Sequence, residues 1–406
     1  MHIVPFAIII NQSNMRMITQ HSLLNRSAIY VKILFLFCIF LVLPSCKPIV
    51  SLGRNPKNED LAKIESLPNY QNGQFRNIED TITRSDSHTT AGNPASAAPT
   101  TRRRNRWTGL FKYFFRDKTS THPTTPIPIM VTDLHTRFEK PTVIWFGHSS
   151  ALVKTKGANI LFDPSFSGFA GPFRGLVNAF SGTNYYVSKD FPSLDAVVIS
   201  HDHYDHLDYT TIRQLRKKTK RFVVPMGVGS HLRRWGIPAD KISEVNWHDV
   251  VTINDSLRII STPAHHRSNR TFAQRKTLWS SYIVDDGEHK IYFSGDTGYS
   301  RHFKLIGDQY GPIDLALLEC GQYNERWTRS HMFPWQTVRA AQDLRAQTVI
   351  PIHWGKFAES THAWNDPVNR LMKSADSTGQ AVSVPYIGEP YSIGDQPLTY
   401  RWWDFK

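Results

Sequence analysis

The stretch His201-Asp202-His203-Tyr204-Asp205-His206 decides the fold, and it directly follows the apolar run 196–200. A buried strand that ends in imidazoles and carboxylates packs poorly, but zinc readily accepts these side chains as ligands. In an extended chain alternate side chains share a face, so His201 and His203 can hold one ion. Asp205 and His206, on the turn that follows, can reach a second ion. Single loop histidines are often ordinary polar residues, yet three histidines and two aspartates in six positions indicate a site for two metals.

Three later places in the chain repeat this pattern of a ligand-type residue at the end of an apolar run. They are His265 and His266 after 257–263, Asp296 after 291–293, and His353 after 349–352. Loops held at one edge of a rigid scaffold are where catalytic groups often lie. We therefore expect these residues to complete the metal site.

The chain resembles the metallo-β-lactamase fold superfamily, whose signature is His-x-His-x-Asp-His followed by a separate His, an Asp and a final His. The resemblance is to the branch that contains N-acyl-phosphatidylethanolamine phospholipase D and the ascorbate-6-phosphate lactonase-like hydrolases. It implies an α/β fold of the αββα sandwich type. The segments that carry the resemblance are 145–149, 161–164, 200–209, 262–266, 295–299, 323–327 and 352–355.

The resemblance also implies a ligand set for two divalent ions, with zinc as the expected metal. One ion is assigned His201, His203 and His266, the other is assigned Asp205, His206 and His353, and Asp296 is assigned to both. The family places its separate histidine three residues after a Thr-Pro pair, which selects His266 over its neighbour. His265 is then expected to line the pocket.

Four further residues, and Asp205 for a second time, have roles implied by the resemblance. His331 is expected to face the substrate and assist at the leaving group or oxyanion, with Asp205 as a second catalytic residue; the alternative for His331 is a polar residue at a helix start. His148 and Asp163 are expected either to orient ligands, because metal-bound histidines normally donate their other N–H to an acceptor, or to be structural. Tyr323 is expected near the pocket.

Two cations held about 3.5–4 Å apart can lower the pKa of a shared water to about 7 and stabilise charge on a phosphate or carbonyl oxygen. The resemblance favours a phospholipase D-like phosphodiesterase, in which a metal-bridging hydroxide releases N-acylethanolamine from N-acyl-phosphatidylethanolamine. Two alternatives stay open. One is a metal-dependent lactonase or amidase acting on a small molecule, and the other is a non-enzymatic metal-binding scaffold.

The N-terminal 46 residues have the pattern of an export signal. Arg26 and Lys32 precede the apolar run 33–43, which is shorter than the about 20 residues that span a bilayer but suits a signal-peptide core. The run ends in Leu-Pro-Ser-Cys46, which resembles the bacterial lipobox. A buried apolar helix or a short membrane anchor is the alternative. We expect a lipid-anchored protein of the bacterial cell envelope, facing the periplasm or the exterior.

Residues 47–128 are predicted to form a tether, because the Ser, Thr, Asn, Pro and Ala that dominate 80–101 cannot bury a core. Within it, 102–118 has aromatic residues at helical spacing among basic ones, which predicts an amphipathic basic helix. This helix would lie on an anionic membrane surface or cap the hydrolase domain, and nucleic acid is not an expected partner. A membrane phospholipid is the expected substrate, and the sequence does not indicate an oligomeric state.

The hydrolase domain is predicted to cover 129–406. Strands are predicted at 142–146, 151–155, 159–162, 196–200, 221–224, 257–262, 278–284, 290–294, 315–319 and 348–352. Helices are predicted at 210–218, 229–235, 301–306 and 337–344.

Overall fold

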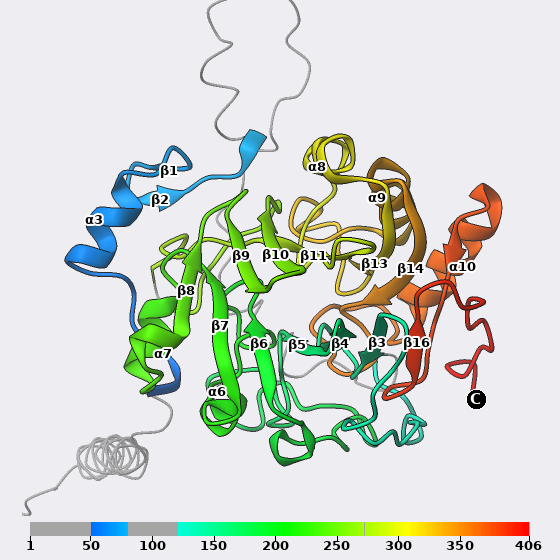
Figure 1. The fold of residues 1–406 in the computed structure, drawn as a ribbon. Helices are drawn as coiled ribbons and strands as arrows, with labels where there is room; N and C mark the ends of the chain where they lie inside the picture. The colour runs from blue at the N-terminus through cyan, green and yellow to red at the C-terminus, as the bar shows by residue number, and fades with distance from the viewer. Residues whose placement is uncertain (1–49, 80–120, 272, 406) are drawn as a thin grey trace, which may run out of the picture. The chain divides into compact units, whose positions relative to one another are not determined.

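The computed structural model describes residues 50–79, 121–271 and 273–405, and two seven-stranded sheets form its centre (Figure 1). The first sheet has the spatial order β16 (Pro390–Ser392), β3 (Thr142–Trp145), β4 (Ala151–Thr155), β5 (Ala158–Phe162), β6 (Leu194–Val198), β7 (Thr219–Pro225) and β8 (Ile242–Val245). Neighbours are antiparallel from β16 to β5 and parallel from β5 to β8.

The second sheet mirrors this mixed arrangement. Its order is β15 (Ala381–Val382), β14 (Ala346–Ile352), β13 (Ile313–Glu319), β12 (Lys290–Phe293), β11 (Ser281–Asp285), β10 (Leu257–Thr262) and β9 (Val250–Asn254). Strands β12 to β15 pair in parallel, and β9 to β12 pair antiparallel. Phe162 of β5 stacks on Phe293 of β12 with ring centroids 4.6 Å apart, so apolar side chains of the two sheets meet between them.

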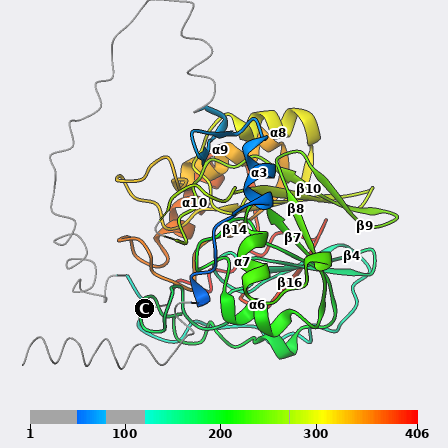
Figure 2. The ribbon, with the colours of Figure 1, turned by 90° about the vertical axis from the view of Figure 1, so that its left-hand side faces the viewer.

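Helices cover the outer faces of both sheets (Figures 1 and 2). They are α6 (Tyr209–Leu215) and α7 (Gly229–Arg234) beside the first sheet, and α8 (His302–Tyr310), α9 (Pro334–Leu344) and α10 (Asp366–Thr378) beside the second. Helix α9 packs on β13 and β14, which explains why those strands are buried along nearly their whole length. The predicted αββα sandwich is confirmed.

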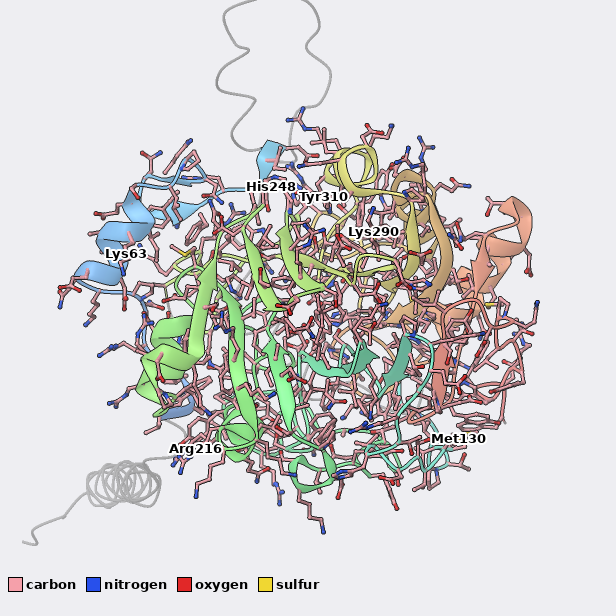
Figure 3. All side chains as sticks on the ribbon, viewed as in Figure 1. Lys63, Met130, Arg216, His248, Lys290 and Tyr310 are labelled. Atoms are coloured by element: carbon pink, nitrogen blue, oxygen red, sulfur yellow. The ribbon has the colours of Figure 1, made fainter. Side chains whose placement is uncertain are left out.

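Polar contacts also hold α8 on the second sheet. The carbonyl of Tyr310, at the end of α8, accepts a hydrogen bond of 2.8 Å from Lys290 Nζ on β12. The hydroxyl of Tyr310 lies 3.1 Å from His248 Nδ1, and the two rings are stacked with centroids 6.4 Å apart (both residues are labelled in Figure 3). The helix that follows the Asp296 loop is therefore fixed at both its backbone and its last side chain.

Each strand and helix predicted within 129–406 overlaps an observed one, but several bounds differ. The strand predicted at 278–284 begins only at Ser281, because Leu278 and Trp279 join a separate apolar cluster instead. The prediction omitted β8, β9, β16 and α10, among other elements.

The predicted tether is wrong for residues 51–79, which pack against the hydrolase domain. They form α3 (Glu59–Glu65) and the hairpin β1 (Tyr70–Gln71) and β2 (Gln74–Phe75), and they belong to the same compact unit as the two sheets. Ile64, Tyr70 and Phe75 bury their side chains against Leu278 and Trp279. Three well-spaced apolar residues in a polar stretch suffice to dock on a surface that is already folded, although they could not form a core alone.

The start of the hydrolase domain at residue 129 is also corrected, since Thr121 and Ile127 are already buried. The predicted signal peptide, the lipobox and the basic helix 102–118 lie outside the described residues. In the part of the chain that is described, no helix has both the length and the apolar character needed to cross a membrane.

Candidate metal centre

The sequence-predicted ligands lie in loops that follow four strands. The His201 loop follows β6, His266 follows β10, Asp296 follows β12 and His353 follows β14. The structure brings these loops together in overlapping clusters whose potential ligand atoms lie within 4.8 Å of one another. The clusters are His201, His203, His266 and Asp296; His148, Asp205, His206 and His353; and Asp296, Glu319, His331 and His353.

Asp296 lies between the first two clusters and faces both. Its Oδ2 is 3.7 Å from Nε2 of His201 and 3.7 Å from Nε2 of His266. Its Oδ1 is 3.1 Å from Nε2 of His206 and 3.2 Å from Nδ1 of His353. One carboxylate therefore directs one oxygen to each cluster, as a residue shared between two cations must.

Unpaired nitrogens show that these clusters fit metal ions. The Nε2 atoms of His201, His203, His206 and His353 are buried and make no hydrogen bond, and neither does Oδ1 of Asp296. Buried polar atoms are normally paired. Metal–nitrogen bonds of about 2.0 Å in tetrahedral geometry separate ligand atoms by about 3.3 Å, which is close to the 3.1 Å between Nε2 of His206 and Oδ1 of Asp296. The donor set of imidazoles and carboxylates suits borderline divalent ions such as zinc.

A hydrogen-bonded network on the β6 side orients the ligands. Asp163 Oδ2 accepts from His206 Nδ1 at 2.7 Å, and its Oδ1 accepts from the backbone N–H of Ser200 at 2.7 Å. The Ser200 hydroxyl lies 2.9 Å from His201 Nδ1. His148 Nε2 lies 2.8 Å from Asp205 Oδ2. Asp163 and His148 therefore contact ligand side chains directly, which is the orienting position expected for them.

Backbone strain accompanies this network. Asp163, His148 and His353 have φ angles of 38°, 52° and 65°, in the left-handed region that residues other than glycine rarely adopt. Two hydrogen bonds of 2.8 Å, from His148 N to Trp354 O and from His353 N to His148 O, hold the last two loops in this conformation. Such strained positions cluster at functional sites because the surrounding structure must fix them.

Burial shifts the protonation of the imidazoles toward the neutral form that binds metals. It lowers the pKa of His203 to about 4 and holds the pKa values of His201, His266 and His353 well below the usual range. Burial acts the same way on His206, but the carboxylates around it outweigh burial and hold its pKa well above the usual range. Burial raises the pKa of Asp296 to about 6. A cation would reverse the last two shifts, because it favours neutral imidazole and ionised carboxylate.

His331 lies at the mouth of the centre. Its ring stacks on His353 with centroids 5.1 Å apart and meets His266 at 5.3 Å. Its Nδ1 lies 3.0 Å from Oε2 of Glu319, a residue that sequence analysis missed. Glu319 is fully buried at the end of β13, and its other oxygen accepts from Met332 N at 2.6 Å. The signal that could have found Glu319 is the same as for the ligands, since it is an acidic residue directly after the apolar run 315–318.

Tyr323 is placed differently from the expectation, His265 is placed as expected, and a third residue was not predicted. The Tyr323 hydroxyl donates to Asp366 of α10, and its ring stacks on His362 rather than joining the clusters. His265 lines a small pocket beside His266, and its Nδ1 lies 3.0 Å from Glu79 Oε2. Glu359 was not predicted; burial raises its pKa well above the usual range, and the carboxylates of Asp205 and Asp296 add to this effect.

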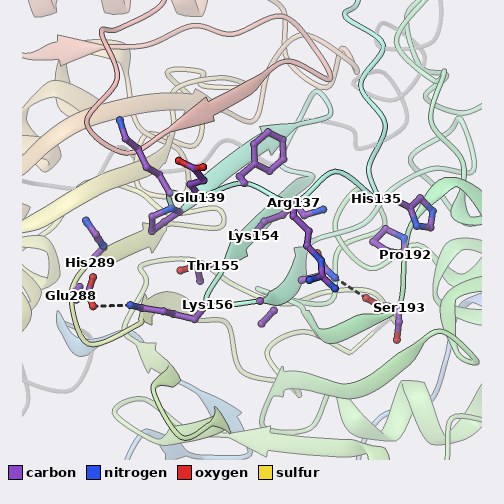
Figure 4. Close-up of a pocket in the computed structure, with 16 residues that line it drawn as sticks. His135, Arg137, Glu139, Lys154, Thr155, Lys156, Pro192, Ser193, Glu288 and His289 are labelled. Carbon is purple, nitrogen blue, oxygen red and sulfur yellow. Dashed lines mark hydrogen bonds and ion pairs between the residues drawn. The ribbon is translucent and has the colours of Figure 1, made fainter.

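A cavity of about 700 Å³ lies away from the histidine clusters (Figure 4). It surrounds the turn between β4 and β5 and shares no lining residue with the histidine clusters. Two of its cations already have partners, since Lys156 Nζ pairs with Glu288 at 2.7 Å and Lys154 Nζ donates to Leu134 O at 2.7 Å. The chemistry therefore belongs to the clusters and not to this cavity.

Comparison with known proteins agrees with this fold and site. Residues 158–354 match the family described as the beta-lactamase superfamily domain. An uncharacterized protein of Mycobacterium tuberculosis is 35% identical over 350 residues, which cover 84% of this chain and 89% of that protein. The N-acyl-phosphatidylethanolamine-hydrolyzing phospholipase D 1 of Caenorhabditis elegans is 31% identical over 275 residues, which cover 62% of this chain and 76% of that enzyme.

Among solved structures, a metallo hydrolase from the archaeon Ignicoccus hospitalis superposes with a TM-score of 0.50. It is 24% identical and covers 63% of this chain and 100% of its own, so it supports the fold alone. Fold and site define a metal-dependent hydrolase with a metal site of histidines and aspartates. The chain belongs to the metallo-β-lactamase superfamily.

Proposed function

We propose that this protein is a phospholipase D-like phosphodiesterase that cleaves N-acyl-phosphatidylethanolamine into N-acylethanolamine and phosphatidate. The observation that carries the proposal is the position of Asp296 between two clusters of unpaired imidazole nitrogens. The named activity of the C. elegans relative supports the choice of substrate.

The proposed ligand sets follow the clusters, with two zinc ions as the expected metals. His201, His203 and His266 would hold one ion, Asp205, His206 and His353 the other, and Asp296 both. When bound, two such ions lower the pKa of water and stabilise negative charge on phosphate oxygens. The hydrolysis adds water across the bond between phosphorus and the ethanolamine oxygen.

The chain's own residues supply orientation and a proton. Asp163 holds His206, Ser200 holds His201, and His148 contacts Asp205, so the ligand side chains are fixed before any substrate binds. We assign His331 as the donor of a proton to the leaving oxygen. Because Nδ1 of His331 is directed to Glu319, Nε2 is the nitrogen left for the substrate. The proton that it donates is the Nε2 proton of the imidazolium form, and the ring is left neutral with its Nδ1 proton on the Glu319 side.

We also propose a cellular location for the protein, which is supported by the sequence alone. A lipid on Cys46 would anchor the chain in the bacterial cell envelope, where a membrane phospholipid is at hand. Mass analysis of the chain expressed in a bacterium tests this point, because a diacylated N-terminal Cys46 is expected and an unmodified residue would contradict it.

Metal content and lipid hydrolysis measured on the same full-length protein in detergent test the proposed activity. We expect about two metals per chain, as a two-metal site requires, and release of N-acylethanolamine that stops on chelation and returns with zinc. Two metals without lipid cleavage would contradict the substrate and direct the search to lactones and amides. A protein that binds no metal would contradict the site itself.

A further inference from the structure

A small polar pocket lies on the outer side of His266. It has a volume of about 320 Å³, at the lower end of the range of ligand pockets. Three parts of the chain build it: the N-terminal segment, the loop after β10 and the loop before α9. Its lining residues are Asn77, His265, His266, Arg267, Arg275, Arg326, Trp327, Thr328, Arg329 and Ser330.

Four of these residues are arginines, and none of the lining residues that the structure describes is acidic. Guanidinium groups stay charged at any physiological pH. Within the described chain, Arg267 and Arg326 form no ion pair. Arg329 Nη2 lies 3.9 Å from Glu79 Oε2, a carboxylate that lies closer to His265, at 3.0 Å. Like charges gathered in a concave site raise the local concentration of anions.

The pocket adjoins the metal centre through a single imidazole. His266 Nε2 faces His203 Nδ1 at 3.4 Å on the metal side, while its Nδ1 lies 2.9 Å from the carbonyl of Ser330, which lines the pocket. The charge of Arg267 also reaches the centre: after burial and the neighbouring histidines, it contributes to the lowered pKa of His266. His266 is therefore common to the metal centre and the pocket.

We propose that this arginine pocket binds a second anionic group of the substrate, a phosphate or a carboxylate, beside the phosphodiester that is cleaved at the metals. Arginine suits this task because its planar fork of N–H donors matches the oxygens of either group. The preferred substrates are then phosphodiesters that carry at least one further negative charge in the headgroup. This choice of substrate rests on the proposed phosphodiesterase function, whereas anion binding by the pocket does not.

Two double variants separate the pocket from general surface charge. Arg326→Gln with Arg329→Gln removes two cations from the pocket, and both side chains are exposed, so the fold should tolerate the change. Arg174→Gln with Arg234→Gln removes the same charge from two exposed arginines outside the pocket. All are compared as full-length protein in neutral detergent.

The first readout is calorimetric binding of inorganic phosphate to the metal-free full-length chain, with its fold checked by circular dichroism. We expect the affinity to fall at least about tenfold in the pocket variant, the effect of losing one or two charge-assisted hydrogen bonds, and to stay unchanged in the control variant. No phosphate binding by the wild type, or equal binding by all three proteins, overturns the pocket. An equal loss in both variants assigns the effect to overall charge and overturns it too.

The second readout is kcat/KM of the zinc-loaded enzyme on two lipids in the same micelles. N-acyl-phosphatidylserine differs from N-acyl-phosphatidylethanolamine by one carboxylate in the headgroup. We expect the wild type to prefer the serine lipid about tenfold, and the pocket variant alone to lose that preference while it cleaves the ethanolamine lipid normally. No preference in the wild type overturns the substrate subsite. Failure to cleave either lipid contradicts the proposed function, and phosphate binding then decides the pocket by itself.

Discussion

The two sides of the metal centre are built differently. On the β6 side, Asp163 and His148 are fully buried and hydrogen-bonded to ligand side chains. On the side of His266, the neighbouring groups are His331, the exposed arginines, and Asn77 and Glu79 of the docked segment. The first side holds ligands rigidly because nothing there can move without breaking buried hydrogen bonds. The second side has exposed side chains, among them Arg267, Arg326 and Arg329.

Asp296 joins the two sides, so its loss should have the largest effect. We expect Asp296→Asn to reduce lipid hydrolysis below detection and to lower the metal content, because the amide cannot supply two anionic oxygens. Metal analysis and turnover of the zinc-loaded protein check this. Asp308→Asn, on the exposed face of α8, should retain both. Full activity in Asp296→Asn would contradict a centre shared between two ions.

Substitution of His331 tests the side of the centre around His266 without removing a metal ligand. We expect His331→Gln to reduce kcat by about 10²–10⁴-fold, the usual contribution of a general acid, while two metals per chain remain bound. Glu319→Gln should reproduce part of this loss, because it removes the carboxylate that holds Nδ1 of His331. Loss of metal in either variant would instead assign these residues to the metal-binding machinery.

Substitution of Asp163 tests the β6 side of the centre. We expect Asp163→Asn to weaken metal affinity by about 10–100-fold, as changes behind a ligand histidine typically do, measured by competition with a chelator. The exposed ion pair of Lys220 and Asp195 offers a matched control, and Asp195→Asn should bind metal like the wild type. An unchanged affinity in Asp163→Asn would mean that His206 needs no support.

The docked segment should have the smallest effect. Asn77 Oδ1 accepts from His266 N at 3.0 Å and from Trp279 Nε1 at 2.9 Å. Asn77→Ala leaves the buried His266 N–H without this acceptor, which we expect to cost about 1–3 kcal/mol of stability in chemical unfolding. Gln71→Ala, which removes an exposed hydrogen bond, should change it by less than about 0.5 kcal/mol. Equal stability of the two variants would show that the segment does not support the His266 loop.

Local sequence was sufficient for the ligand loops and for most strands. Each ligand follows an apolar run. A buried strand that ends in imidazoles or carboxylates can be recognised from its own sequence, without knowledge of the strands beside it. Glu319 follows the same rule and could have been found. The start of β11 at Ser281 and the docking of 51–79 could not have been found from local sequence. Both depend on apolar contacts of Phe75 with Leu278 and Trp279, which lie far from Phe75 in the chain.

The sequence by itself therefore determined most strands and the residues that meet at the edge of the sheets, since each follows from a pattern within a few positions. The resemblance of those residues to a known family implied the sandwich. Only the tertiary structure decided which residue supports which ligand, that Asn77 reaches the His266 loop, and that arginines from two distant loops share one pocket. The physical reason is that a strand is specified by its own alternation and burial. A pocket is formed by segments that are distant in the sequence, and nothing in the sequence of either segment indicates that they will pack together.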